Sequence, residues 1–558
     1  MCGIFALLNA NKYAAIDTCM IKHAFNNGKS RGPEFSKLVQ TAKNDLSLGF
    51  HRLAINGLNE QSNQPLVLQD IHLICNGEIY NYKSLYKYMN ITPTTGSDCE
   101  VIIHLYMRYG IAQTLLMLDG VFAFVLLDRP RNVLIAARDP LGVRPLYKLH
   151  ITATTPSGKL ASVVGFASEL KSIEPFYHLN PRRSCTKQFE PGTYSVYTYK
   201  NQQWASSALN KLYYIPAFPS SALIDDIRTF QEVVCSTISH ELTNAISKRC
   251  TTTERPVACL LSGGLDSSLV AALVSSFFKQ KNADASIETY SIGLADSVDL
   301  RFARIVANHI GSKHTEIVVT EQEMFDAIPD VIYALESYDT TTVRASIGNY
   351  LLGKYISSHS DAKVIFNGDG ADELFGGYLY MNKCPDDIEF DRETRRLLKD
   401  IHAFDVLRSD KSISSNGLEP RTPFLDRNVV SAVLSIPPYI RNHNNFGEPE
   451  KYLLRHSFNN GLLPDAVLWR RKEAFSDGVS KQGRSLYTIL QEHIARHYTD
   501  TAPCELGYSP NIHLEKKYYK DLFDQAFPHS RHIVPYYWMP KYTDATDPSA
   551  RTLDVYHE

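Results

Sequence analysis

The alternation of apolar and polar positions changes in character partway along the chain. Over residues 1–190, short runs rich in β-branched and aromatic residues are separated by turn signals, a pattern typical of antiparallel strands. The predicted strands are 3–8, 46–50, 71–75, 121–127 and 133–137. A helix is predicted over 98–109, where apolar side chains recur at helical spacing. The first part of the chain is therefore predicted to be an α+β domain with layered sheets.

The second half of the chain has a pattern that predicts a parallel sheet covered by helices. A helical stretch over 227–248 leads into a buried strand, a Gly-Gly turn and a helix start, and further strands are predicted at 288–294, 315–320 and 363–366. Strands that alternate with helices predict an α/β domain. Residues 191–225 show no sustained helical periodicity, so we expect a connecting segment between domains at 2–190 and 226–558.

Composition excludes several classes of protein. At about 150 residues per domain, 558 residues predict at least two domains, and 44% hydrophobic with 21% charged residues is typical of globular proteins. The net charge of −2 gives no overall positive field, so we expect no nucleic acid and no membrane as partners. We expect a cytoplasmic protein because no apolar run could cross a bilayer and no basic signal region precedes the first one. The ten cysteines form no C-x-x-C pair and predict neither a disulfide framework nor a zinc site.

Cys2 is the first candidate for covalent chemistry. Removal of Met1 would place a thiol and a free α-amine on one residue, and the ordinary amine pKa of about 7.7–8.0 suits a base near neutral pH. A cysteine at a frayed chain end would look the same in the sequence. Position alone therefore leaves both interpretations open.

Polar residues further along could complete a site for a carboxamide substrate. Asn76 and Gly77 follow a predicted strand and offer a side-chain amide and a backbone N–H, the kind of donors that an oxyanion hole needs. Arg52 could bind an α-carboxylate, and Asp98 could bind an α-ammonium group. Taken singly, Asn-Gly is also typical of a plain turn, and a charged residue such as Arg52 or Asp98 is typical of a solvated surface.

The ordered set of N-terminal motifs resembles one class of enzyme. Met1-Cys-Gly-Ile-Phe, Arg31-Gly-Pro, His51-Arg-Leu, Asn76-Gly-Glu-Ile-Tyr-Asn and Gly96-Ser-Asp-Cys-Glu are similar, in this order, to the glutaminase domain of N-terminal-nucleophile glutamine amidotransferases. The resemblance implies an αββα sandwich in which Cys2 is the nucleophile and Asn76 and Gly77 form the oxyanion hole. The glutamine-binding residues it implies are Arg52, Leu53, Ala54, Ile55, Asn76, Gly77, Glu78 and Asp98.

A second glycine-rich motif lies at the predicted strand-to-helix turn. Ser262-Gly-Gly-Leu-Asp-Ser-Ser268 can present backbone N–H groups and hydroxyls to a phosphate chain at a helix N-terminus. It lacks the Lys and the glycine spacing of a P-loop, and Gly-Gly alone is common in turns. The full string resembles the pyrophosphate loop of ATP pyrophosphatases. Asp266 would then be a Mg²⁺ ligand, since magnesium favours carboxylate and phosphate oxygens.

Residues 366–378 form another acidic, glycine-rich segment, and they do not meet the spacing of a calcium loop. They resemble the Ser-Gly-Glu-Gly-Ser-Asp-Glu motif of asparagine synthetases, which implies that Asp372 is a second Mg²⁺ carboxylate. Asn367 stands in place of the Ser of that motif, and Asp369 in place of its Glu. The resemblance implies a catalytic role for Asp369 in forming and using an acyl-adenylate, with a carboxylate one methylene shorter.

Two more segments resemble asparagine synthetases. Residues 338–346 imply an acceptor site made of Thr341, Thr342 and Arg344. Residues 469–478 contribute Lys472, a cation suited to departing pyrophosphate, although a basic run in a loop is usually only solvated. The ATP-binding residues implied are Leu260, Leu261, Ser262, Gly263, Gly264, Asp266, Ser267, Ser268, Ile292, Asn367 and Gly368.

The resemblance covers nearly the whole chain and implies the activity of glutamine-hydrolysing asparagine synthetases. Glutamine would supply ammonia, Mg²⁺ and ATP would activate L-aspartate as β-aspartyl-AMP, and ammonia would displace AMP. The expected partners are L-glutamine, L-aspartate and ATP, and the family implies a homodimer. Two alternatives stay open, an amidotransferase with another carboxylate acceptor and a catalytically silent relative. Retention of Cys2, Asn76, Asp266 and Lys472 together disfavours the silent relative.

Overall fold

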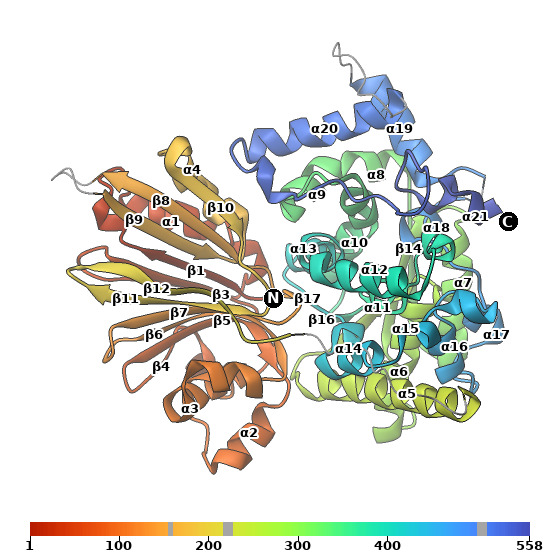
Figure 1. Cartoon of the computed structure of the whole chain (residues 1–558), viewed down its shortest axis with the longest axis horizontal. Helices are drawn as coiled ribbons and strands as arrows, with labels where there is room; N and C mark the ends of the chain where they lie inside the picture. Colours follow the sequence, from red (N-terminus) through yellow and green to blue (C-terminus); the bar gives the residue numbers. More distant parts are fainter. Residues whose placement is uncertain (155–159, 216–226, 482, 499–509, 558) are drawn as a thin grey trace.

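The computed structural model describes residues 1–154, 160–215, 227–481, 483–498 and 510–557. In Figure 1 an N-terminal domain made mainly of strands lies beside a C-terminal domain rich in helices, and the N-terminus lies between the two. Within the ranges described, no helix is both long and apolar enough to cross a membrane.

Two six-stranded antiparallel sheets form the N-terminal domain. The first contains, in spatial order, β10 (Ser184–Gln188), β8 (Tyr147–Thr154), β9 (Leu160–Ala167), β1 (Gly3–Leu8), β3 (Leu46–Arg52) and β2 (Phe35–Gln40). The second contains β12 (Gln203–Leu212), β11 (Thr193–Lys200), β7 (Val133–Arg138), β6 (Gly120–Asp128), β5 (Ile71–Ile79) and β4 (Leu66–Leu68). Apolar side chains from both sheets meet in a shared core between them.

Helices cover the two outer faces of this sandwich. Helices α1 (Thr18–Asn26) and α4 (Glu174–Tyr177) share a core with the first sheet, and α2 (Tyr82–Met89) and α3 (Val101–Met117) share one with the second. The backbone of α3 is interrupted at Gly110, where φ is 73°, one residue beyond the predicted helix end. The layers therefore follow the predicted αββα order.

Residues 193–212 correct the expected boundary of the first domain. They form β11 and β12 instead of a connecting segment, and β11 pairs with β7 from Tyr194 opposite Ala137 to Thr198 opposite Val133. The edge strand β12 exposes most of its side chains, so its polar sequence resembles that of a loop. The N-terminal domain thus extends past residue 190, and residues 216–226 of the expected segment lie outside the described residues.

A five-stranded parallel sheet forms the centre of the C-terminal domain. Its strands are, in order, β15 (Lys313–Val319), β14 (Glu288–Leu294), β13 (Val257–Leu260), β16 (Val364–Phe366) and β17 (Glu419–Arg421). Cys259 belongs to a core on one side of β13, whereas Ala258 and Leu260 belong to a core on the other. Both faces are buried at the centre of the sheet, which explains why β13 and β16 are continuous apolar runs in the sequence.

Helices surround this sheet on both faces (Figure 1). They are α5 (Ile227–Thr251), α6 (Leu265–Lys281), α7 (Val298–Ile310), α8 (Glu321–Asp326), α9 (Ile328–Leu335), α10 (Thr340–His359), α11 (Ala371–Phe375), α12 (Asp387–Asp400), α13 (Asp405–Ser414), α14 (Arg427–Leu434), α15 (Pro438–Arg441), α16 (Tyr452–Ser457), α17 (Asp465–Leu468), α18 (Phe475–Gly478), α19 (Leu486–His497), α20 (Pro510–Ala526) and α21 (Asp554–His557). Strand β13 leads into α6 and β16 leads into α11, so both glycine-rich turns lie at the carboxyl edge of the sheet, the usual place for ligands in such folds.

Candidate active sites in the two domains

Cys2 precedes β1, and its side chain faces the layer between the two sheets of the N-terminal domain. Ile4 and Ala6, two and four residues further on, belong to the core between the sheets, and Cys2 packs against that core. On β5, Ile74 belongs to the same core, and Asn76 lies two residues further on, so its side chain is on the same face of the strand. Strand alternation therefore directs Cys2 and Asn76 into the same layer from opposite sheets.

The Asn76 amide is buried without a partner. Its side chain is 0% exposed, and the described residues offer neither its nitrogen nor its oxygen a hydrogen bond. An unpaired buried amide costs about 1–3 kcal/mol. At Gly77 an added Cβ would lie 2.5 Å from the Val121 carbonyl oxygen, so only glycine fits. These two residues are suited to receive a substrate oxygen.

The segment after β3 forms one wall near Cys2. The Cys2 thiol donates to the Leu53 carbonyl oxygen at 3.6 Å, and burial raises the pKa of this thiol. The Ala54 amide donates to Glu34 Oε2 at 2.7 Å, and the Ile55 carbonyl accepts from the Glu254 amide at 3.0 Å. The predicted residues 53–55 are all buried, and the Leu53 carbonyl oxygen lies beside the Cys2 thiol.

Arg52 is held in position by the loop that follows it. Its guanidinium donates to the Asn59 carbonyl oxygen at 3.0 Å and to Asn63 Oδ1 at 2.7 Å. Burial lowers the pKa of Arg52, and a charged thiolate at Cys2 opposes this effect, so the two groups interact electrostatically. Arg52 is therefore a fixed cation beside the thiol.

Glu78 and Asp98 are buried acids within reach of one amide. Asn56 Nδ2 donates to Glu78 Oε2 at 2.7 Å and lies 3.5 Å from Asp98 Oδ1. Burial raises the pKa of Asp98 to about 6, and burial with the charge of Asp98 raises the pKa of Glu78, although Arg421 lies 3.5 Å from Glu78. An ammonium group bound beside these acids would stabilise their charged forms.

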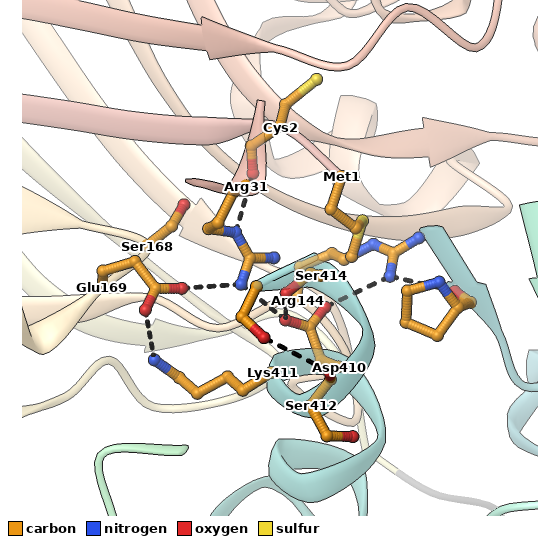
Figure 2. Close-up of polar contacts among 12 residues, drawn as sticks. Met1, Cys2, Arg31, Arg144, Ser168, Glu169, Asp410, Lys411, Ser412 and Ser414 are labelled. Carbon is orange, nitrogen blue, oxygen red and sulfur yellow. Dashed lines mark hydrogen bonds and ion pairs between the residues drawn. The ribbon is translucent and has the colours of Figure 1, made fainter. Parts of the chain in front are cut away.

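Arg31 joins Cys2 to the C-terminal domain (Figure 2). Its Nε donates to the Cys2 carbonyl oxygen at 2.9 Å, and its Nη1 lies 2.7 Å from both Glu169 and Asp410. Asp410 belongs to α13 and also pairs with Arg144 at 3.4 Å. Burial alone would lower the pKa of Arg31, but Asp410 and Glu169 raise it, so this interdomain cation stays charged.

A cavity of about 1670 Å³, which includes space open to solvent, lies at the carboxyl edge of the parallel sheet. The predicted ATP-binding residues that line it are Leu260, Leu261, Ser262, Gly264, Asp266, Ser267, Ile292, Asn367 and Gly368. Gly263 and Ser268 do not line it. Gly263 has a φ of 74° and packs against Ala303, where a Cβ would lie 2.4 Å from the backbone nitrogen, and Ser268 is fully buried.

The two glycine-rich turns pack directly on each other. A Cβ at Gly368 would lie 2.7 Å from the Ser267 amide nitrogen. Ser262 Oγ accepts from the Gly264 amide at 3.3 Å and lies 3.0 Å from Ser267 Oγ. Contacts within the chain therefore hold the shape of this turn.

Two lysines and two aspartates form a charged group in this cavity. Lys451 Nζ lies 2.6 Å from both Asp266 Oδ2 and Asp372 Oδ1, and Lys472 Nζ lies 2.6 Å from Asp372 Oδ2. Burial opposes ionisation, but the neighbouring lysines lower the pKa of Asp372 and the aspartates raise the pKa of Lys472. Asp372 and Lys472 are therefore charged, and the four side chains lie close enough together to hold a polyphosphate and its counter-ion.

Asp369 connects the cavity to α13. Its Oδ1 lies 3.3 Å from Arg408, and its buried Oδ2 has no hydrogen-bond partner in the described part of the chain. Burial raises the pKa of this carboxyl group. Asn367 donates to Ser409 Oγ at 2.6 Å and accepts from the Asp369 amide at 3.3 Å, so the residue that departs from the family motif holds this turn against α13.

The predicted acceptor residues separate into two groups. Thr341 and Thr342 line the cavity, and the buried Thr341 Oγ1 has no hydrogen-bond partner among the residues described. Arg344 does not line it, because its guanidinium is buried in ion pairs with Glu515 at 2.5 Å and Asp547 at 2.7 Å. The structure thus buries Arg344 outside the lining of this cavity, where it connects α10 to Glu515 and Asp547.

The comparisons with known proteins cover the whole chain. A family model described as Asparagine synthase matches residues 237–387 and 382–541, and one described as Glutamine amidotransferase domain matches residues 1–211. Proteins called asparagine synthetase (glutamine-hydrolyzing) from Bos taurus, Gallus gallus and Homo sapiens are each 40% identical to it over 576, 573 and 580 residues, respectively. Each alignment covers 100% of this chain and 99% of the relative. The chain belongs to the asparagine synthase family.

Membership of the asparagine synthase family agrees with the topology of the three sheets. The predicted fold class, an αββα glutamine amidotransferase domain followed by an α/β synthetase domain, is confirmed. In this family member the structure adds Lys451 and Arg408 to the cavity, two residues that the sequence did not single out. No motif in the sequence points to Lys451. In the structure its backbone has a φ of 59°, an uncommon value for a residue other than glycine.

Proposed function

We propose that the chain is a glutamine-dependent asparagine synthetase that hydrolyses glutamine in its N-terminal domain and activates L-aspartate with ATP in its C-terminal domain. The observation that carries the proposal is the 40% identity, over the full length of both chains, to glutamine-hydrolysing asparagine synthetases. The geometry supports it independently. In one domain a half-buried thiol and a buried, unpartnered amide face the same layer, and in the other a cavity is lined with charges suited to ATP.

In the first half-reaction, the Cys2 thiolate attacks the carboxamide carbon of glutamine. Asn76 Nδ2 and the Gly77 N–H stabilise the oxyanion, and one such donor typically contributes about 3–4 kcal/mol. The C–N bond then breaks, and ammonia leaves with a proton from the Cys2 α-amine once Met1 is removed. Water hydrolyses the remaining thioester to glutamate. Arg52 binds the α-carboxylate, and Asp98 with Glu78 binds the α-ammonium group.

In the second half-reaction, the side-chain carboxylate of aspartate attacks the α-phosphorus of ATP and displaces pyrophosphate. The turn at 262–268 holds the phosphates, and Lys472 with Lys451 stabilises the negative charge that builds on pyrophosphate. Thr341 binds aspartate from the N-terminal end of α10. Ammonia then attacks the acyl carbon of β-aspartyl-AMP, AMP leaves, and Asp369 accepts the proton of the incoming ammonia.

The donor set of the cavity fits Mg²⁺. Asp266 and Asp372 lie on either side of Lys451, and the buried Asp266 Oδ1 has no hydrogen-bond partner in the residues described. Two carboxylates plus substrate phosphates match the way proteins usually bind this ion. Bound Mg²⁺ would neutralise phosphate oxygens. The homodimer stays a prediction from the resemblance, and the cytoplasmic location stays a prediction from the hydropathy of the sequence.

The test of this proposal is mass spectrometry of a reaction that contains amide-¹⁵N glutamine, L-aspartate, ATP and Mg²⁺. Labelled asparagine with one AMP per asparagine is the expected result. Glutamate without asparagine or AMP would show that aspartate is the wrong acceptor and would support the alternative of another carboxylate. Treatment with EDTA should stop AMP formation and leave glutamine hydrolysis unchanged, because the proposed ion serves only the second domain.

Asp98 should control glutamine binding below neutral pH. Burial raises its pKa to about 6, so the group is mostly ionised at pH 7 and mostly protonated at pH 5. We expect kcat/KM for glutamine hydrolysis to fall as pH decreases through 6, because a neutral carboxyl cannot pair with the α-ammonium group. Asp98→Asn should raise KM for glutamine at pH 7 by about 30-fold or more, and kcat/KM of the variant should no longer fall as pH decreases through 6. An acid limb unchanged in the variant would contradict the assignment.

Asp369→Glu should keep or increase kcat/KM for aspartate in ammonia-dependent synthesis. The longer side chain restores the family residue at a carboxylate that already lines the cavity. Asp369→Asn, which removes the charge at nearly constant volume, should lower this value by about 10²-fold. Steady-state AMP formation measures both variants. Complete loss of activity in Asp369→Glu would count against aspartate as the acceptor.

A further inference from the structure

A second cavity lies at the end of the sandwich remote from Cys2. It has about 720 Å³, including space open to solvent, and is bordered by β8 and β9 of one sheet and by β11 and β12 of the other, at the left of Figure 1. Asn9, which follows β1, donates to the carbonyl oxygens of Ser162 and Trp204 at 2.8 Å. Cys2 is seven residues away at the other end of β1, which corresponds to roughly 20 Å.

The side chains around this cavity are mostly hydrogen-bond donors. Lys148 and His150 of β8 face the space between the sheets, since Leu149 and Ile151 belong to the core on the outer side. His150 lies 3.1 Å from Ser162 Oγ. Among the described residues that line the cavity, none is an aspartate or glutamate. Lys148 therefore brings a positive charge to the cavity, and no acidic side chain in the described lining balances it.

Two buried polar groups here have no partner. Tyr197 is 2% exposed and Trp204 is 7% exposed, and within the described chain neither the tyrosine hydroxyl nor the indole Nε1 makes a hydrogen bond. An indole N–H can only donate, so it needs an acceptor from outside the protein. Each unpaired group costs about 1–3 kcal/mol. A ligand with several acceptor oxygens would satisfy both.

A pair of like charges lies beside these groups. Lys148 of β8 is directly opposite Lys187 of β10 in the antiparallel register, an arrangement that is normally destabilising. Lys148 Nζ lies 5.8 Å from the centre of the Tyr197 ring. Burial and then the charge of Lys187 lower the pKa of Lys148. A bound anion would relieve this repulsion.

We propose that the cavity is a binding site for a small oxyanion, a carboxylate or phosphate group, held by Lys148 as the counter-charge and by Tyr197 and Trp204 as hydrogen-bond donors. The site is distinct from the two active sites and shares no residue with them. Carboxylates and phosphates have the same donor requirement, and the experiment separates them.

The experiment is ¹⁹F NMR on the full chain labelled with 5-fluorotryptophan. The chain contains three tryptophans, so three resonances are expected. Inorganic phosphate is titrated in one arm and citrate in the other, and the Trp204→Phe variant assigns the resonance. We expect a saturable shift of the Trp204 resonance in at least one arm, and the arm that saturates at lower concentration identifies the preferred anion. Trp538 lines the ATP cavity, so its resonance reports binding there separately.

Lys148→Met should weaken this binding by tenfold or more. Lys37→Met removes the same charge from β2, the opposite edge of the same sheet, and should leave binding unchanged. Tyr197→Phe keeps the ring and removes one donor, so it should weaken binding severalfold even if Lys148→Met fails to fold. A Trp204 shift that does not saturate, or that is equal in wild type and Lys148→Met, would indicate an adventitious ion only and overturn the proposal. A shift of Trp538 alone would overturn it too.

Discussion

Replacing Cys2 by alanine should abolish asparagine formation from glutamine and leave formation from ammonia unchanged. Cys2 faces the layer that also receives the unpaired amide of Asn76, and the variant removes the sulfur that would carry the glutamyl group. We expect glutamine hydrolysis to fall by at least about 10³-fold. Ammonia-dependent synthesis should stay within about twofold of wild type, because the ATP cavity lies in the other domain. Release of glutamate and of AMP measures the two activities separately.

Cys19→Ala is the matched control for this experiment. Cys19 is an exposed cysteine on α1, so its loss should change neither activity. Substantial glutamine hydrolysis by Cys2→Ala would show that another group is the nucleophile. Parallel loss of both activities would instead indicate that the variant damages the interface that Arg31 makes with the second domain.

Lys451→Met should abolish formation of the acyl-adenylate. The variant removes the cation that lies 2.6 Å from both Asp266 and Asp372, so Asp266 would lose its lysine and Asp372 would keep only Lys472 while both carboxylates face the ATP phosphates. We expect exchange of labelled pyrophosphate into ATP to fall by about 10²-fold or more, since charge stabilisation of this kind is worth several kcal/mol. Glutamine hydrolysis should persist.

Lys541→Met provides the comparison. Lys541 is half-exposed and pairs with Glu393 at 2.7 Å, so the substitution removes an equal charge from the same domain without touching the phosphate site. Exchange should remain near the wild-type rate in this control. If Lys451→Met also keeps the wild-type exchange rate, Lys451 has no part in holding the polyphosphate.

Burial of a face helps a strand to be predicted but does not ensure it, because β11 buries alternate residues and still lies in the expected connecting segment. Strand 3–8 was expected with the bounds that β1 has, and 288–294 with those of β14. The edge strand β12 escaped prediction because its side chains are mostly polar and exposed, and only its pairing with β11 makes it a strand. The local sequence pattern shows which positions are apolar, but it does not show which strands pair with each other.

The candidate sites divide in a similar way. Cys2, Asn76 and Asp266 lie in compact motifs whose chemistry can be read from neighbouring residues. For Arg344 the resemblance implies a place in the acceptor site, and nothing near it in the sequence shows its partners, Glu515 and Asp547, which lie more than 170 residues away. Long-range ion pairs decide whether such a cation is available to a ligand. Assignment of the remaining predicted residues rests on the experiments above.

The buried ion pairs along α13 limit how the two halves of this chain can be exchanged with those of relatives. One helix supplies Arg408 to the turn that carries Asp369 and Asp410 to the Arg31 contact that holds the Cys2 carbonyl. Loss of one partner from a buried ion pair typically costs about 3–5 kcal/mol. A chimera built by joining a foreign amidotransferase domain to this synthetase domain would therefore need the residues that face α13 to be transplanted together with it.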